Sequence, residues 1–404
     1  MRAVVAALMM LLTSAARSAQ SDVSASRTTP ANNLRQATEI AVLLLPGSAS
    51  NPALREQAAA QRRAARGPFV GPPVVSGDLE IGGEGFSEQE VSVSAGIRWP
   101  GEGRAARRAA DLSVDAIGAS LDEARLQIAG DVRSAWWALA SARAALATER
   151  EQARLADQEV ATVARLVNAG VQARRDLLLV EAERSAVEAR LSAAEGEVAA
   201  AQATYEALAG PAPAQFPPEA LAPPSASVDD HPAIRAALAR AATAEARASA
   251  VAYGSRPRIE GRVGVRRERV DARDGFENAL LVGVGVPIGR DYGAVAESAG
   301  ARSEALRARA EAARVRSRLI ADRAAGERRL AIARRAVGEA EARRAALAEA
   351  LALTERGRRE GEIGYVEVLR ARQALGQAER DAVTARIAAL AAISAFNQAQ
   401  GVLP

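Results

Sequence analysis

The sequence predicts an α+β membrane protein in which a duplicated repeat combines a β-hairpin with long helices of the coiled-coil type. Three observations predict this class. Long stretches consist of Ala, Glu, Arg and Leu at helical spacing, while aromatic residues make up only 3% of the 404 residues. Four short segments instead alternate apolar and polar residues with period two. One helical stretch, 361–401, has a counterpart at 170–210.

The duplication is supported by aligned anchor residues and by the order of the elements. Shifting 361–401 back by 191 positions places Gly361 on Gly170 and Glu367 on Asp176. Chance alignment of Ala-rich helices is the alternative interpretation. The same start signal also occurs in both halves, however, as Asn51-Pro52 and as His231-Pro232, where proline suits the first helical position. We therefore predict two repeats separated by a proline-rich linker.

The element order in each repeat follows from periodicity and from glycine and proline breaks. Residues 1–19 carry one early arginine, an apolar run and then small residues, which indicates a secretory signal peptide and its cleavage region. Repeat 1 spans 20–210, the linker 211–230 and repeat 2 231–404. The predicted elements are start helices at 34–66, a hairpin at 74–99, a long helix at 104–168 and a return helix at 171–208, then a start helix at 232–252, a hairpin at 258–287, a long helix at 295–359 and a return helix at 362–400.

Composition excludes several classes of function. The 53 basic residues are interleaved with 49 acidic ones for a net charge of +4, a pattern typical of solvated helix faces rather than nucleic-acid binding. Cysteine is absent and His231 is the sole histidine, so we expect no enzyme, no metal site and no cofactor. After the signal peptide no apolar run is long enough for a transmembrane helix, so entry into a membrane requires β-strands.

The four strands carry apolar residues on one face and polar residues on the other, which suits strands with lipid on one side and water on the other. A soluble hairpin packed on a core fits the pattern equally well. The shortage of core-forming residues favours the membrane, because no independent core is available to cover the apolar face. The water-facing lining then comprises Asp78, Glu80, Ser92, Ser94, Arg98, Glu260, Arg262 and Arg266.

The order of elements resembles the TolC-like outer-membrane efflux family. The likeness rests on the two start signals, on the Trp99-Pro100 strand exit, and on Gly361 with Glu367-Val368-Leu369 and its copy in repeat 1. The segment 286–293 also resembles the branch that serves heavy-metal pumps of the cobalt-zinc-cadmium type, with Arg290 and Asp291 in swapped order.

This resemblance implies a homotrimer in the outer membrane of a Gram-negative bacterium. Three chains would form a 12-stranded β-barrel continued by a periplasmic α-helical barrel. The implied partners are outer-membrane lipid, a periplasmic adaptor protein and an inner-membrane transporter. The implied function is the passive exit duct of a tripartite efflux system. The outer duct of a type I protein secretion system and a soluble periplasmic coiled-coil scaffold are the alternatives.

The resemblance also implies a periplasmic gate just after the glycine breaks Gly170 and Gly361. There Glu367 and its counterpart Asp176 occupy the first acidic position, and Arg370 stands where many relatives place a second acid. We expect Glu367 and Arg370 from three chains to form a ring of charge pairs at a constricted entrance. An exposed helix pair three residues apart, without a gating role, is the alternative.

Overall fold

The computed structural model describes residues 30–44, 51–83, 86–223, 227–271 and 273–404. The predicted signal peptide lies outside the described residues. The chain divides into two compact units. We call them the helical unit, which comprises Met1–Pro46, Ala124–Val228 and Leu319–Pro404, and the sheet unit, which comprises Gly47–Glu123 and Asp229–Arg318.

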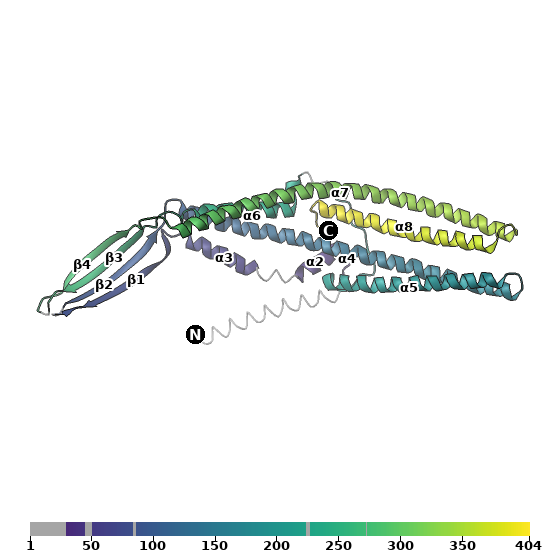
Figure 1. Cartoon of the computed structure of the whole chain (residues 1–404), viewed down its shortest axis with the longest axis horizontal. Helices are drawn as coiled ribbons and strands as arrows, with labels where there is room; N and C mark the ends of the chain where they lie inside the picture. Colours follow the sequence, from purple (N-terminus) through teal and green to yellow (C-terminus); the bar gives the residue numbers. More distant parts are fainter. Residues whose placement is uncertain (1–29, 45–50, 84–85, 224–226, 272) are drawn as a thin grey trace. The chain divides into compact units, whose positions relative to one another are not determined.

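The sheet unit contains the four strands together with helical segments from both repeats (Figure 1). These elements are α3 (Asn51–Ala64), β1 (Phe69–Ile81), β2 (Ser87–Ile97), the first part of α4 (Glu102–Asn168), α6 (Pro232–Val251), β3 (Glu260–Arg269), β4 (Glu277–Gly285) and the first part of α7 (Tyr292–Arg359). A short 3-10 helix, η3 (Val228–Asp230), precedes α6, and the side chain of His231 caps α6 by accepting a hydrogen bond from Ala233 N.

The four strands form one antiparallel sheet in the order β1-β2-β3-β4. The two hairpins pair through β2 and β3, so the two repeats share one sheet. Strand β1 begins at Phe69 rather than at the predicted residue 74, because Phe69 and Val70 also pair with β2, beyond a register shift between Val70 and Val74. Pro72 and Pro73 lie within that shift and on an edge strand, where a missing backbone N–H breaks no ladder.

The helical unit contains α2 (Leu34–Leu43), the remainder of α4, α5 (Arg174–Ala209), the remainder of α7 and α8 (Tyr365–Ala399). Its hydrophobic core lies where α2, α4 and α5 meet. Trp136 and Tyr205 are completely buried there, and Trp136 packs edge-on against Phe216 of the linker, with ring centroids 5.1 Å apart. Six of the twelve buried residues in this cluster are alanines, which allow close helix approach. None of the helices in the described part of the chain is both long and apolar enough to cross a membrane.

Candidate functional site

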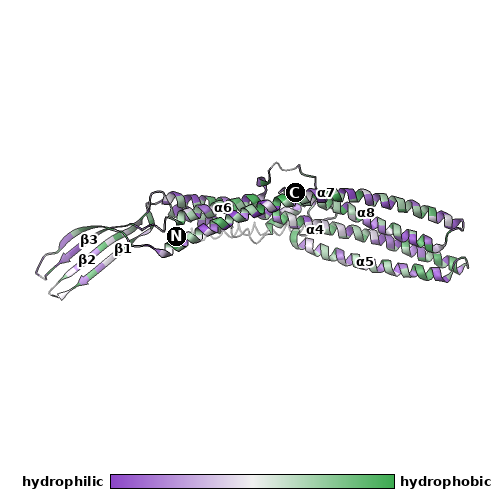
Figure 2. Ribbon diagram, turned by 45° about the horizontal axis from the view of Figure 1, so that its top comes forward, coloured by the Kyte–Doolittle hydropathy of each residue, from purple (hydrophilic) through white to green (hydrophobic). Residues whose placement is uncertain are grey.

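The sheet has one polar face, on which the acidic strand residues and two arginines gather. Directly paired residues of antiparallel strands share a face, so the register assigns each strand side chain to one of the two faces of the sheet. Figure 2 shows the alternation of hydrophilic and hydrophobic residues along the strands. The polar face comprises Asp78, Glu80, Glu88, Glu90, Ser92, Ser94, Glu260, Arg262, Arg266, Glu268 and Glu277.

Charge pairs link the strands across this polar face. The Arg262 guanidinium donates to Glu90 Oε1 at 2.7 Å and to Ser92 Oγ at 2.9 Å. Arg266 lies 3.5 Å from the nearest carboxylate oxygen of Glu88. The face therefore carries charges of both signs, with acids in the majority, and offers a hydrated surface rather than a site for one ligand.

The opposite face, which we call the apolar face, is uncovered within the sheet unit. Its central side chains are exposed, from 45% for Val93 to 73% for Leu280. A contiguous patch of this kind marks an interaction with lipid or protein. The central residues are Val91, Val93, Val263, Val265, Leu280 and Val282.

Arg98 does not belong to the polar face, on which the sequence pattern placed it. Strand β2 ends at Ile97, and the Arg98 guanidinium donates to the backbone oxygens of Phe69, at 2.7 Å, and Ala64, at 2.6 Å. The alternation fails here because the strand has already ended, and Arg98 instead fixes the junction between α3 and β1.

In the helical unit, the glycine breaks close two helices in the same way. Gly170 and Gly361 have φ of 72° and 83°, which favours glycine. The N–H of Gly361 donates to Arg358 O, and the N–H of Glu362 donates to Gly357 O, which is a Schellman motif. Gly170 and Val171 repeat these bonds after α4. As a result, the return helices begin at Arg174 and Tyr365, three residues later than predicted.

The three predicted gate residues lie in different surroundings. Glu367 and Arg370 form a pair with 3.9 Å between Oε1 and Nη1, and both side chains are more than half exposed. Asp176 is only 4% exposed and accepts hydrogen bonds from Gln172 and Arg175. The aligned acids Asp176 and Glu367 are therefore not equivalent within one chain.

A cluster of polar side chains next to the second glycine break ties the helices together, and we call it the helix-end cluster. The Tyr365 hydroxyl donates to Glu159 Oε1 of α4 at 2.6 Å. Arg372 of α8 donates to Glu159 and, at 2.7 Å, to Glu355 of α7. Arg358 stacks on the Tyr365 ring, 4.4 Å from its centroid. The cluster therefore joins α4, α7 and α8.

Burial shapes the acid–base behaviour of this cluster. It raises the pKa of Tyr365 to about 12, and the nearby Arg358 charge opposes that rise. Burial also lowers the pKa of Arg372. Since both groups keep their protons at neutral pH, the hydroxyl and the guanidinium remain hydrogen-bond donors to Glu159.

A cavity of about 490 Å³ borders the helix-end cluster in the helical unit. Four acids and a single arginine line it, so it carries excess negative charge and favours cationic groups. At the wall of this cavity, hydrogen bonds join α8 to the helix pair α4 and α5. Gln152 of α4 donates to Glu379 of α8, and Gln373 of α8 donates to Glu183 of α5. The charged lining residues are Glu159, Glu183, Glu355, Glu379 and Arg372.

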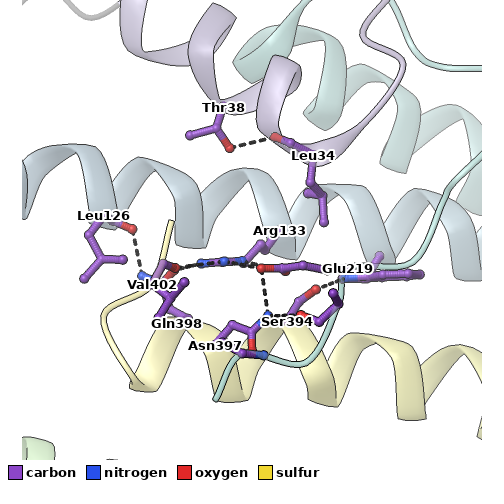
Figure 3. A network of polar contacts seen from close by, with 12 residues as sticks. Leu34, Thr38, Leu126, Arg133, Glu219, Ser394, Asn397, Gln398 and Val402 are labelled. Atoms are coloured by element: carbon purple, nitrogen blue, oxygen red, sulfur yellow. Dashed lines mark hydrogen bonds and ion pairs between the residues drawn. The ribbon is translucent and has the colours of Figure 1, made fainter. Parts of the chain in front are cut away.

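A second polar network binds the linker to the helical unit (Figure 3). Arg133 of α4 forms a bidentate pair with Glu219 of the linker, at 2.5 and 3.0 Å, and both side chains are buried. Arg133 also donates to Gln398 Oε1 and to Val402 O, while Asn397 donates to Glu219. The predicted irregular linker is thus held at a fixed point by charge-assisted hydrogen bonds.

Sequence reasoning missed both of these networks. Their partners are far apart in the chain, 206 residues for Glu159 and Tyr365. Two signals were nevertheless present. Glu219 is the only acid in the stretch 211–228, and Tyr365, an aromatic residue in a chain with few, follows the break at Gly361.

Comparison with known proteins shows which solved structures share this fold. Scans of protein-family models and of curated proteins found no match. Among solved structures, the outer membrane protein VceC from Vibrio cholerae matches with a TM-score of 0.73 at 18% identity, covering 91% of this chain and 96% of that one. The MtrE outer membrane channel of Neisseria gonorrhoeae in its open state matches with a TM-score of 0.71 at 20% identity, covering 92% and 89%. CusC, which forms a transmembrane channel, matches with 0.74 at 16% identity, covering 92% of each chain.

These similarities extend over nearly the whole chain, so the resemblance to TolC-like outer-membrane channels is confirmed at the level of the fold. The helical content and the small antiparallel sheet agree with that class.

Proposed function

We propose that this chain, which has the fold of TolC-like outer-membrane channels, forms a homotrimeric exit duct in the outer membrane of a Gram-negative bacterium. Three four-stranded sheets would close into a 12-stranded barrel, and the helices would continue it as an α-helical barrel in the periplasm. Energy would come from an inner-membrane transporter joined to the duct by a periplasmic adaptor.

The observation that carries this proposal is the uncovered apolar face opposite an ion-paired polar face. A lipid-exposed sheet cannot have open edges, because unpaired backbone groups are costly in hydrocarbon. Strands β1 and β4 are the two edges of the sheet, and pairing them with neighbouring copies satisfies both. The soluble scaffold predicts an apolar face covered by a core, and the exposure of Val282 and Leu280 argues against it.

The polar face would line the barrel and provide a wide, hydrated passage of weak selectivity. Mixed charge on Arg262, Glu90 and Asp78 fits a passive conduit. This part of the proposal holds equally for an efflux duct and for the outer duct of a type I protein secretion system. The resemblance of 286–293 to the heavy-metal branch favours metal efflux, and this choice of cargo rests on that segment alone.

The helix-end cluster would act as the gate, together with the ring of Glu367 and Arg370. Tyr365 and Arg372 hold α8 to α4 and α7, so releasing them would allow the helix pairs to separate. The pair of Glu367 and Arg370 is exposed in one chain, which leaves both side chains available to neighbouring copies.

Purified protein tests the proposal directly. We expect an oligomer that migrates as a trimer in detergent gels without heating, fractionates with outer membranes and conducts ions in planar bilayers. A monomer that is soluble without detergent would contradict the proposal. Cross-linking in cells, followed by identification of the captured transporter, separates efflux from protein secretion.

A further inference from the structure

The cavity beside the helix-end cluster combines an apolar wall with excess negative charge, and the proposed duct uses neither. Its volume is about 490 Å³, and residues of α4, α5, α7 and α8 line it. All of these residues belong to the helical unit. The cavity is therefore complete within one chain.

The apolar wall extends from buried valines to an exposed leucine. Val180 and Val187 of α5 are its most buried members, with exposed fractions of 2% and 4%. Leu155 of α4 is 44% exposed at the opposite extreme. The other apolar side chains are those of Ala156, Leu351, Leu369 and Leu375. A wall of this kind accommodates the hydrophobic body of a small molecule.

One of the four acids that line the cavity has no basic partner. Arg372 donates to two of the other acids, and Arg190 lies 3.2 Å from the third. Glu379 accepts its hydrogen bond from an uncharged amide, that of Gln152, at 2.9 Å. Four carboxylates beside two guanidinium groups leave an excess of negative charge. The three acids with basic partners are Glu159, Glu355 and Glu183.

The carboxylate of Glu379 is held in place without being neutralised. The Gln152 side chain lies against Gly376 of α8, where an added β-carbon would lie 2.9 Å from Gln152 Oε1. A larger residue at this position would displace the amide that contacts Glu379. Positioning by an uncharged donor leaves the charge of Glu379 available to a ligand.

The acids are arranged for a large cation rather than for a metal ion. Metal ions such as Ca²⁺ need several oxygen ligands at about 2.3–2.6 Å. In the described part of the chain, no three acids or other ligating side chains are grouped closely enough to hold a metal. Dispersed negative charge beside an aliphatic wall instead suits a cation whose charge is surrounded by apolar groups.

We propose that this cavity binds an amphiphilic organic cation, with the charge near Glu379 and the apolar body against Val180 and Leu369. Such a ligand contacts both helix pairs, α4 with α5 and α7 with α8. The inference goes beyond the proposed exit duct and does not depend on it, because one chain supplies every lining residue.

Equilibrium dialysis of the detergent-purified full-length protein tests the inference with two ions of the same shape and opposite charge. The probes are tetraphenylphosphonium, a cation, and tetraphenylborate, an anion. Dialysis against protein-free detergent corrects for uptake by the micelles. We expect the unaltered protein to bind the cation about tenfold more tightly, a factor that one partly buried charge pair can supply.

Three variants separate the charge from the shape of the cavity. Glu379→Gln should reduce the preference for the cation about tenfold. The matched control Glu349→Gln removes the same charge from an exposed position of α7 that does not line the cavity, and it should keep the preference. Ala156→Leu narrows the cavity without changing its charge and should weaken cation binding. Circular dichroism and the unfolding temperature establish that each variant is folded.

Two results would overturn the site. One is equal binding of the two ions by the unaltered protein, and the other is an equal loss of preference in Glu379→Gln and Glu349→Gln. Either result leaves the proposed duct intact if the protein forms heat-resistant trimers and conducts ions. Conversely, a monomeric, non-conducting protein that still selects the cation through Glu379 overturns the duct and retains the site.

Discussion

The two helix breaks of the repeat share one backbone geometry but differ in their side chains. Gly170 and Gly361 end their helices with the same pair of Schellman hydrogen bonds. The acid six residues later is buried in the first repeat, as Asp176, and exposed in the second, as Glu367. The turn, which depends on one glycine, is thus the same at both breaks, while the surroundings of the neighbouring side chains differ.

The helix-end cluster extends this difference. Tyr365 and Arg372, in the return helix of repeat 2, reach Glu159 of repeat 1. The aligned positions in repeat 1 are Arg174 and Glu181, so the same contacts are impossible there. The contacts of the helix-end cluster therefore form beside the second break and not beside the first.

The largest effect on channel opening is expected from removing the guanidinium of Arg372 from the helix-end cluster. Arg372→Ala leaves Glu159 and Glu355 without their shared guanidinium, and a charge-assisted hydrogen bond contributes about 1.5–3 kcal/mol. We expect the open probability in planar bilayers to rise about tenfold or more. Arg370→Ala removes the other proposed gate contact, a pair that is exposed within one chain and worth at most about 1 kcal/mol there, and should raise the open probability by a smaller factor. An equal effect of the two variants would contradict the prediction that the helix-end cluster contributes more than the exposed ring of Glu367 and Arg370 to keeping the channel closed.

The two aligned acids offer the next test. Asp176→Ala removes a buried acceptor from Gln172 and Arg175, at an expected cost of about 1–3 kcal/mol in the free energy of unfolding. Glu367→Ala should cost less than about 1 kcal/mol, because its partner is exposed. Denaturant unfolding measures both values. Equal losses would mean that the two repeats use their acids in the same way.

Substitution of the two glycines should give equal and smaller effects. Gly170→Ala and Gly361→Ala each force a β-carbon into the left-handed region, which costs about 1–2 kcal/mol. No atom outside the turn lies within 4 Å of the added carbon at either site, so only the cost of the left-handed backbone conformation applies. Thermal unfolding of the two variants should shift by the same amount. A large difference would contradict the equivalence of the turns.

The smallest effect concerns pH. The folded-state pKa of Tyr365 is about 12, above the usual value near 10, so the fold favours the protonated hydroxyl. Its contribution to stability is complete below pH 10 and disappears as the pH rises from about 10 to 12. Absorbance titration of tyrosinate in the unaltered protein and in Tyr365→Phe should show one late-titrating group missing from the variant. A normal titration midpoint for that group would contradict its burial.

Local sequence patterns predicted the strands and turns better than the side-chain contacts of the candidate site. The strands β2 and β3 and the glycine turns at the breaks are determined by residues that are close together in the sequence. The sheet and the turns could therefore be predicted from the sequence. Arg98 shows the limit of that method, because alternation does not reveal that β2 ends one residue earlier. The contact of Glu159 with Tyr365 depends on helix packing across 206 residues, and periodicity contains no information about it.

The pairing of Arg133 with Glu219 shows the same limit for the linker. Prolines correctly indicated irregular backbone, but a proline-rich composition does not reveal which side chain is anchored. The lone acid among those prolines is buried in the structure because α4 supplies its partner.

The most direct test of the central claim is disulfide cross-linking between the two edges of the sheet. The native chain has no cysteine, so introduced cysteines report without interference. Within one chain two strands separate β1 from β4, a distance of about 14 Å, which no disulfide can span. We predict that a cysteine at Ser76 of β1, combined with one at Ala279, Leu281 or Gly283 of β4, gives a covalent trimer on oxidation for at least one pair. Monomers at every pair would contradict a barrel closed by three chains.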